Sequence, residues 1–242
     1  MFNILDSVDS TNNYAMAMIH AGMAKQGMAW FAHEQTVGRG QQGKTWESSA
    51  GQNIALSIVV QPREVFFQNQ FYFNAAVANA CYDFYRSYAG EDVSIKWPND
   101  IYWRDRKAGG ILIENKLMGK TWKWAVIGIG ININQTIFSD QLINVVSLKQ
   151  ITGKQYEPVS LAKELYEYVV QAVNETTEMD FPVILARYNE RLFQKGKITR
   201  LKKDNMVFET RIKGVNEYGQ LITEDTVERL FNFGEVEWVR EV

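Results

Sequence analysis

The chain is poor in cysteine and histidine. It holds one cysteine, Cys81, and two histidines among 242 residues. A single cysteine excludes an internal disulfide. It stands in an apolar, helix-like stretch, so we interpret Cys81 as a buried small side chain rather than a nucleophile. So few cysteine and histidine residues also lack the spacing of a zinc site.

A strong excess of charge and a long apolar run are also missing. The formal net charge is -2, which argues against broad nonspecific binding of nucleic acid. No apolar run reaches the roughly 18 residues of a membrane span, and residues 1–6 lack a basic segment followed by an apolar core. We therefore expect a soluble cytoplasmic protein that binds neither nucleic acid nor membrane.

The first 195 residues mix helical and strand patterns, and at 46% hydrophobic the chain can build a sizeable core. Apolar spacing predicts helices over 10–21, 68–88, 160–173 and 181–193, and strands over 29–32, 53–60, 93–97, 101–103, 111–114 and 124–133. Short turns separate the middle strands, which favours hairpins over long crossovers. The patterns predict an α+β domain with a mixed, largely antiparallel sheet.

The pattern changes after Lys195-Gly196. Short alternating segments at 197–201, 206–213, 221–223 and 236–239 predict strands, with turns at Asp204-Asn205 and Tyr218-Gly219. Such a run of β-hairpins makes a small barrel or half-barrel. We expect one domain over residues 1–195 and a second over 196–242.

Two neighbouring blocks, Lys96-Trp97-Pro98-Asn99-Asp100 and Lys107-Ala108-Gly109-Gly110, carry the densest polar pattern. They lie at the ends of strand-like runs, which suits a pocket that handles phosphate or a carboxylate. Lys96 and Lys107 could instead be solvated surface charges, although each adjoins apolar sequence. Asp100 could be a turn residue, bind Mg²⁺ or orient a nucleophile.

The glycine-rich segment 38–45, Gly-Arg-Gly-Gln-Gln-Gly-Lys-Thr, matches the strings of two nucleotide-binding loops. Both motifs must open a helix, whereas here Ser48-Ser49-Ala50-Gly51 and a strand follow, so a P-loop is a minor alternative. The glycines can still turn backbone N–H groups toward an anion, and Arg39 and Lys44 add positive charge. The alternative is an ordinary flexible surface loop.

Two further features suit a flat ligand. Trp46 could stack over adenine, or be a core residue. Gly128 and Gly130 interrupt an apolar strand, where glycine permits close approach of a ligand or another backbone. Asn132, just beyond them, could contact a nucleotide or simply end the strand.

Four blocks together resemble the biotin–protein ligases, also called biotin–[acetyl-CoA-carboxylase] ligases. In chain order they are Asp9-Ser10-Thr11-Asn12; Gly38-Arg39-Gly40-x-x-Gly43-x-x-Trp46; Lys96-Trp97-Pro98-Asn99-Asp100 with Lys107-x-x-Gly110-Ile111-Leu112-x-Glu114; and Gly128-x-Gly130-Ile131-Asn132-x-Asn134. The Lys-Trp-Pro-Asn-Asp block is the most specific. The resemblance covers about residues 1–195. It implies a class II synthetase-like catalytic domain, followed by a small SH3-like β-barrel.

The resemblance implies a two-step reaction. Biotin and MgATP give biotinyl-5′-AMP and pyrophosphate, and a lysine of a biotin carboxyl carrier protein then takes the biotinyl group. The implied biotin-binding residues are Ser10, Thr11, Asn12, Gln35, Arg39, Gly40, Gln41, Lys107 and Gly110. The implied ATP-binding residues are Gly38, Gly43, Lys44, Trp46, Lys96, Asn99, Asp100 and Asn132.

Three residues carry the implied chemistry: Lys107, Arg39 and Asp100. Lys107 would neutralise negative charge where the carboxylate meets the α-phosphate. Arg39, with its loop, would close over biotin and the acyl-phosphate. Asp100 would serve Mg²⁺ and orient or deprotonate the acceptor lysine, whose unperturbed pKa is about 10.4.

The chain departs from the family pattern at two loop positions. Gln41 and Lys44 stand where many relatives have arginine, and an amide cannot fork onto phosphate, so we expect weaker retention of the adenylate. Some relatives also carry an N-terminal helix-turn-helix. Here Ser10 falls ten residues into the chain, so we expect no sequence-specific DNA binding.

Three alternatives stay open at this point. A lipoate–protein ligase has a related fold and also modifies a lysine. A non-catalytic biotin-binding module would keep the pocket without the reaction, and a P-loop enzyme would hydrolyse nucleotide without biotin. Relatives occur as monomers and dimers, and exposed strand edges allow a homodimer.

Overall fold

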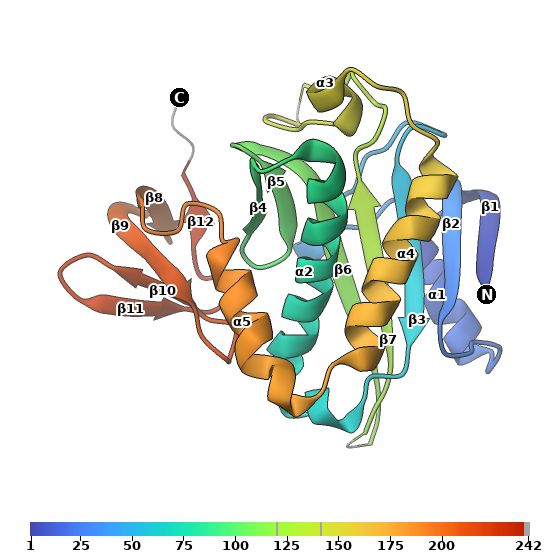
Figure 1. Cartoon of the computed structure of the whole chain (residues 1–242), viewed down its shortest axis with the longest axis horizontal. Helices are drawn as coiled ribbons and strands as arrows, with labels where there is room; N and C mark the ends of the chain where they lie inside the picture. The colour runs from blue at the N-terminus through green and yellow to red at the C-terminus, as the bar shows by residue number, and fades with distance from the viewer. Residues whose placement is uncertain (120, 141, 240–242) are drawn as a thin grey trace.

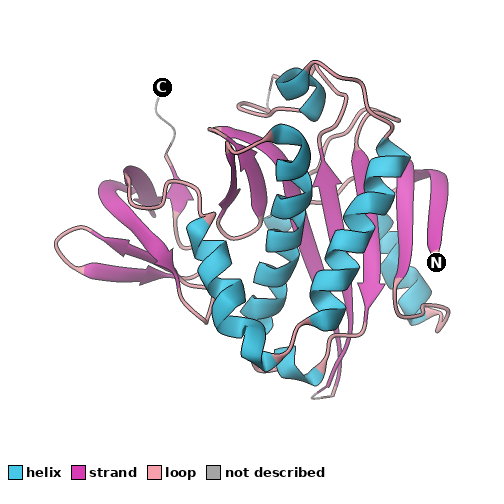
Figure 2. Ribbon diagram, viewed as in Figure 1, coloured by secondary structure: helices cyan, strands magenta, loops and turns pink. Residues whose placement is uncertain are grey.

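The computed structural model describes residues 1–119, 121–140 and 142–239 and contains two β-sheets (Figures 1 and 2). The larger sheet has the strand order β1-β2-β3-β7-β6-β5-β4. Its strands are β1 Phe2–Val8, β2 Met28–Gln35, β3 Ile54–Val60, β4 Val93–Lys96, β5 Asp100–Trp103, β6 Arg106–Met118 and β7 Thr121–Ile131. Only β1 and β2 pair in parallel. The expected mixed, largely antiparallel sheet is confirmed.

Helices cover both faces of this sheet. They are α1 Thr11–His20, α2 Gln70–Ala89, α3 Leu148–Thr152, α4 Pro158–Glu175 and α5 Phe181–Glu190, with single 3₁₀ turns η1 Gln41–Gly43, η2 Glu64–Phe66 and η3 Glu178–Asp180. Figure 1 shows α2 and α4 side by side across one face, with α1 behind the sheet. None of the helices within the described residues is both long and apolar enough to span a membrane.

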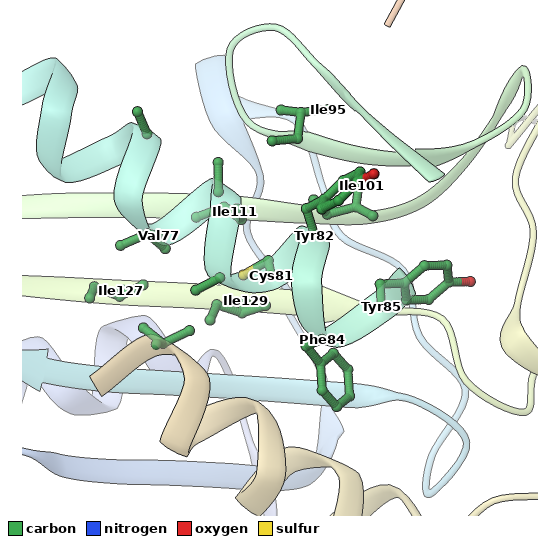
Figure 3. Packing of buried hydrophobic residues seen from close by; sticks show 14 of the residues in the cluster. Val77, Cys81, Tyr82, Phe84, Tyr85, Ile95, Ile101, Ile111, Ile127 and Ile129 are labelled. Atoms are coloured by element: carbon green, nitrogen blue, oxygen red, sulfur yellow. The ribbon is translucent and has the colours of Figure 1, made fainter. Parts of the chain in front are cut away.

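The face toward α2 holds the main hydrophobic core. In Figure 3, Val77, Cys81 and Phe84 of α2 lie against Ile127 and Ile129 of β7. Cys81 is fully buried, and this burial raises the pKa of its thiol well above the ordinary range. The interpretation of Cys81 as a buried small side chain is therefore confirmed.

The face toward α1 is built differently, because small residues alternate with the large core residues. In register across the three central strands, Ser57 of β3 lies beside Gly128 of β7, and Ala55 lies beside Gly130, which in turn pairs with Gly110 of β6. Side chains of alternate residues point to opposite faces of a strand. The small residues therefore leave open space on the α1 side of the sheet.

The smaller sheet contains β8 Ile198–Lys203, β9 Met206–Val215, β10 Leu221–Glu224, β11 Glu228–Phe231 and β12 Glu237–Trp238. Its order is β11-β10-β9-β8-β12, with antiparallel pairing throughout. Among the described residues β11 and β12 remain unpaired edges, so these strands form an open sheet, in line with the expected half-barrel, and the closed barrel that the resemblance implied is not confirmed. The main hydrophobic cluster continues into it through Leu201 and Ile212.

The expected helices and strands appear within a few residues of their predicted positions, and β6 is longer than expected, over 106–118 instead of 111–114. Three elements were not expected: β1, α3 and β11. Lys195-Gly196 lies in the connection between α5 and the smaller sheet.

Candidate active site

A cavity of ≈ 550 Å³ lies on the α1 side of the central strands. The predicted site residues that line it are Ser10, Thr11, Asn12, Gln35, Arg39, Gly40, Gln41, Lys44, Trp46, Lys96, Asn99, Asp100, Lys107, Gly110 and Asn132. They come from the start of α1, the end of β2, the glycine-rich loop, the segment from the end of β4 to β6, and the residue that follows β7. The fold therefore brings segments more than a hundred residues apart into one site.

Gly38 and Gly43 do not line the cavity; they shape the loop. A Cβ atom on Gly38 would lie 2.2 Å from the Trp46 carbonyl oxygen, and the Trp46 N–H donates to the Gly38 carbonyl at 2.9 Å. Gly43 has φ +75, a conformation that favours glycine. The loop leads into β3 rather than a helix, so the P-loop alternative is wrong.

One end of the cavity is polar, buried and uncharged. The Thr11 N–H donates to Gln35 Oε1 at 2.8 Å, and the Ser57 hydroxyl lies 2.7 Å from Thr11 Oγ1 and 2.6 Å from Asn12 Oδ1. Ser10, directly before α1, is buried, but its side chain does not cap the helix. Sequence reasoning missed Ser57, although it is the one polar residue inside the apolar strand β3.

Two glycines of β7 let neighbouring side chains reach the cavity floor. A Cβ atom on Gly128 would lie 2.2 Å from Asn12 Oδ1, and one on Gly130 would lie 2.4 Å from Trp46 Cε2. The expected close approach at these glycines is therefore made by two side chains of the same chain.

An ion pair occupies the middle of the site. Lys107 Nζ lies 2.8 Å from Asp100 Oδ1, and both side chains are half-buried. A Cβ atom on Gly110 would lie 3.2 Å from Asp100 Oδ1, so the glycine keeps room beside the pair. Burial, together with the Asp100 carboxylate, raises the pKa of Tyr188, whose hydroxyl donates to the Pro98 carbonyl at 2.9 Å.

The other end combines aromatic rings with amides. Lys96 Nζ lies 3.1 Å from the Tyr102 hydroxyl and 5.4 Å from the centre of the Trp238 ring. Asn99 Nδ2 donates to the Ile111 carbonyl, and Asn132 Nδ2 donates to the Val146 carbonyl at 3.3 Å. These bonds hold both amides at the cavity wall.

Two buried polar atoms of the loop, Gln41 Oε1 and Trp46 Nε1, have no hydrogen-bond partner among the described residues. Buried polar atoms are nearly always paired, so each exception calls for an explanation. Both residues line the cavity, which suggests that a ligand supplies the missing partner.

The smaller sheet also contributes to the cavity wall, which sequence reasoning missed. Its lining residues are Phe233, Gly234, Val236, Glu237 and Trp238. Trp97 Nε1 donates to the Gly219 carbonyl at 2.9 Å, which ties the central motif to this sheet. No local pattern could have indicated a contact between segments so distant in the chain.

Asp100 is the one residue that the sequence analysis predicted to bind a metal ion. Among the described residues no three His, Cys, Asp or Glu side chains gather around a common point. Mg²⁺ typically takes one or two carboxylates together with phosphate oxygens and water. The residues therefore fit an ion carried on phosphates and not a dedicated protein cage.

A family model described as the biotin/lipoate A/B protein ligase family matches residues 4–132. The bifunctional ligase/repressor BirA of Bacillus spizizenii is 26% identical over 232 residues, which cover 94% of this chain and 71% of that protein. The biotin–[acetyl-CoA-carboxylase] ligase of Paracoccus denitrificans is 36% identical over 134 residues, covering 54% and 53%. The solved structure of the Aquifex aeolicus biotin protein ligase in complex with biotin and ATP superposes with a TM-score of 0.82 at 23% identity, covering 99% of each chain.

Proposed function

This chain belongs to the biotin/lipoate A/B protein ligase family, and we propose that it is an ATP-dependent biotin–protein ligase. It forms biotinyl-5′-AMP and transfers the biotinyl group to a lysine of a biotin carboxyl carrier protein. One observation carries this proposal: a single cavity holds an uncharged polar end, a central Lys107–Asp100 pair and an end lined by Trp46.

The polar end favours biotin over lipoate. The ureido ring of biotin offers N–H donors and a carbonyl acceptor, whereas the dithiolane ring of lipoate offers neither. Ser10, Thr11 and Gln35 present neutral donors and acceptors, and the first two are nearly fully buried. A site built to hydrogen-bond its substrate rejects an analogue without those groups by about 10⁴-fold or more.

In the first step a carboxylate oxygen of biotin attacks the α-phosphorus of ATP, and the bond to pyrophosphate breaks. Negative charge grows where the two anions meet. Lys107, already held by Asp100, places its ammonium at the middle of the cavity and stabilises that charge. Trp46 and Asn132 pack against the adenosine portion at the far end.

In the second step the amine of the acceptor lysine attacks the carbonyl carbon of the anhydride. The carbon–oxygen bond to AMP breaks, and the amine gives up a proton. A protonated amine is no nucleophile, so a base or an orienting acceptor is needed. Asp100 is our candidate, because its carboxylate faces the cavity beside Lys107.

Mg²⁺ enters this proposal only with the nucleotide. Asp100 would hold it, together with phosphate oxygens. When bound, the ion neutralises phosphate charge and so complements Lys107.

We also propose the division into a catalytic domain, 1–195, and a C-terminal domain, 196–242, that resembles an SH3-like unit. The lining residues Phe233, Gly234, Val236, Glu237 and Trp238 support a role for the second domain at the nucleotide end of the cavity. The carrier protein of a biotin-dependent carboxylase stays the predicted partner. A homodimer also stays a prediction, since β1 leaves an edge of the large sheet unpaired among the described strands.

The test is the intact mass of a purified biotin carrier domain after incubation with this protein, biotin and MgATP. We expect a gain of one biotinyl group that requires ATP. A parallel reaction with lipoate should leave the mass unchanged. Modification with lipoate alone would replace the proposal by a lipoate ligase. No modification, with no biotin-dependent exchange of pyrophosphate into ATP, would leave a binding module.

A further inference from the structure

Glu114 of β6 connects Asn12, at the uncharged polar end of the cavity, to Arg39 of the glycine-rich loop. Its Oε2 accepts a hydrogen bond from Asn12 Nδ2 at 2.9 Å and one from Arg39 Nη1 at 3.0 Å. Its Oε1 lies 3.0 Å from Arg39 Nη2. The carboxylate therefore forms a two-pronged pair with the loop arginine while it also bonds the first turn of α1.

Arg39 also makes a hydrogen bond to a second residue of α1, Asn13. Arg39 Nη1 donates to Asn13 Oδ1 at 2.8 Å, and Asn13 Nδ2 donates to Asp9 Oδ2 at 2.6 Å. The Asp9 carboxylate thus fixes which way the Asn13 amide points, and the hydrogen bond from Asn13 lowers the pKa of Asp9. Because a guanidinium has five N–H donors and these contacts use three, Arg39 keeps donors for a ligand.

The same carboxylate stands at one end of a series of polar contacts across the cavity floor. Asn12 Nδ2 donates to Glu114 and to the Leu112 carbonyl, so Asn12 Oδ1 must accept the proton of Ser57. The Thr11 hydroxyl lies 2.7 Å from the Ser57 hydroxyl and 3.1 Å from Gln35 Oε1. Gln35 Oε1 then accepts the Thr11 N–H. These contacts connect Glu114 of β6 with Gln35 of β2.

We propose that Glu114 is a positioning residue for biotin binding, which holds Arg39 and Asn12 in one arrangement before the ligand arrives. An isolated surface ion pair contributes little. This pair differs, since Glu114 is half-buried, the contact is bidentate and a buried amide shares the carboxylate. The inference rests on the proposed function, because it takes the polar end to bind biotin.

The first test is a double-mutant cycle of Glu114→Ala, Arg39→Ala and their combination, read by biotin-dependent pyrophosphate exchange. We expect Glu114→Ala to raise the KM for biotin about tenfold while the KM for ATP stays within about twofold. Because Glu114 acts through Arg39, the double variant should lose less than the product of the two single effects. Glu114→Gln should be intermediate, since its amide oxygen can still accept from Asn12.

The matched control is Glu224→Ala, which removes the partner of a pair of similar length, Lys213–Glu224 at 2.9 Å, on the smaller sheet. It should leave both KM values unchanged. Two outcomes would overturn the inference. The first is that the effects of Glu114→Ala and Arg39→Ala multiply fully in the double variant, and the second is that Glu114→Ala raises both KM values equally. If Glu114→Ala fails to fold, Glu114→Gln decides by the same two criteria.

A second measurement does not depend on ligase activity. Trypsin cleavage after Lys44, followed by mass spectrometry without ligand, should be faster in Glu114→Ala than in the unaltered protein, because the loop loses its anchor. Equal rates would overturn the inference. Should the unaltered protein show no pyrophosphate exchange, the proposed function fails, and the cleavage rates alone decide whether Glu114 orders the loop.

Discussion

At the scale of single residues, two glycines of β7 lie at different ends of the cavity, Gly128 beside Asn12 and Gly130 beside Trp46. Gly128→Ala would push on Asn12, and Gly130→Ala would push on Trp46, because the added Cβ atoms fall 2.2 Å and 2.4 Å from those side chains. We expect the first change to raise chiefly the KM for biotin and the second chiefly the KM for ATP. Each variant controls for the other in steady-state kinetics, and identical profiles would contradict the assignment of the two ends.

Lys107 gives a second prediction at this scale. Replacing Lys107 by alanine removes the cation at the middle of the cavity, so we expect about a 10²-fold to 10³-fold loss of biotin-dependent pyrophosphate exchange. Lys154→Ala, at an exposed lysine, serves as the control and should keep full activity. Circular dichroism checks that both variants fold. Activity close to normal in Lys107→Ala would remove the central assignment of the proposal.

A third prediction at this scale concerns Gln41 and how tightly the protein holds biotinyl-5′-AMP. Gln41→Arg places a forked cation at a cavity-lining position, so we expect slower escape of biotinyl-5′-AMP. The measurement is the rate at which preformed, labelled adenylate leaves the protein after dilution. An unchanged or faster rate would show that the neutral amide does not limit retention.

Motif spacing predicted the residues that gather at the cavity, but not the contacts among them. Ser57 is a single polar residue in an apolar strand, and Glu114 stands in a motif block that does not name its contacts; the partners of both come from α1 and the loop. Trp238 reaches the cavity from the other sheet. Such contacts depend on how elements pack, and a single sequence contains no local signal for packing.

At the scale of elements, the contact between α2 and the large sheet should carry much of the stability. Ile127 is fully buried against α2 (Figure 3). Ile127→Ala should therefore lower the free energy of unfolding by about 2–5 kcal/mol, measured by urea denaturation. Ile198→Ala, where the side chain is 62% exposed, should change it by no more than about 0.5 kcal/mol. Comparable losses at both positions would contradict this account of the core.

The elements that sequence patterns missed share a physical cause. In β1, partly exposed apolar residues mix with Asp6 and Ser7, so neither face shows a continuous apolar stripe; its strand conformation comes from parallel pairing with β2. α3 has five residues, too few for helical periodicity, and Ser147 caps it through a reciprocal bond with Gln150. β11 is largely exposed and short. Long, buried elements were predictable because periodicity reports burial.

At the scale of the whole molecule, the two sheets share one hydrophobic cluster. Leu192, which follows α5, and Leu201 and Ile212 of the smaller sheet belong to the same cluster as α2. We therefore expect a single cooperative unfolding transition, with tryptophan fluorescence and far-ultraviolet circular dichroism giving the same midpoint. Two separated transitions would mean that the smaller sheet unfolds independently of the larger one.

The wall that Phe233 to Trp238 add to the cavity has a practical consequence for anyone who attaches another polypeptide. A fluorescent protein or affinity tag joined after Val242 would begin directly after the four residues that follow Trp238, which lines the cavity. Met1 lies at the opposite end of β1 from Val8, roughly 20 Å away along the strand (Figure 1). Fusions at the N-terminus are therefore the ones that should leave labelling of large acceptor proteins unimpeded.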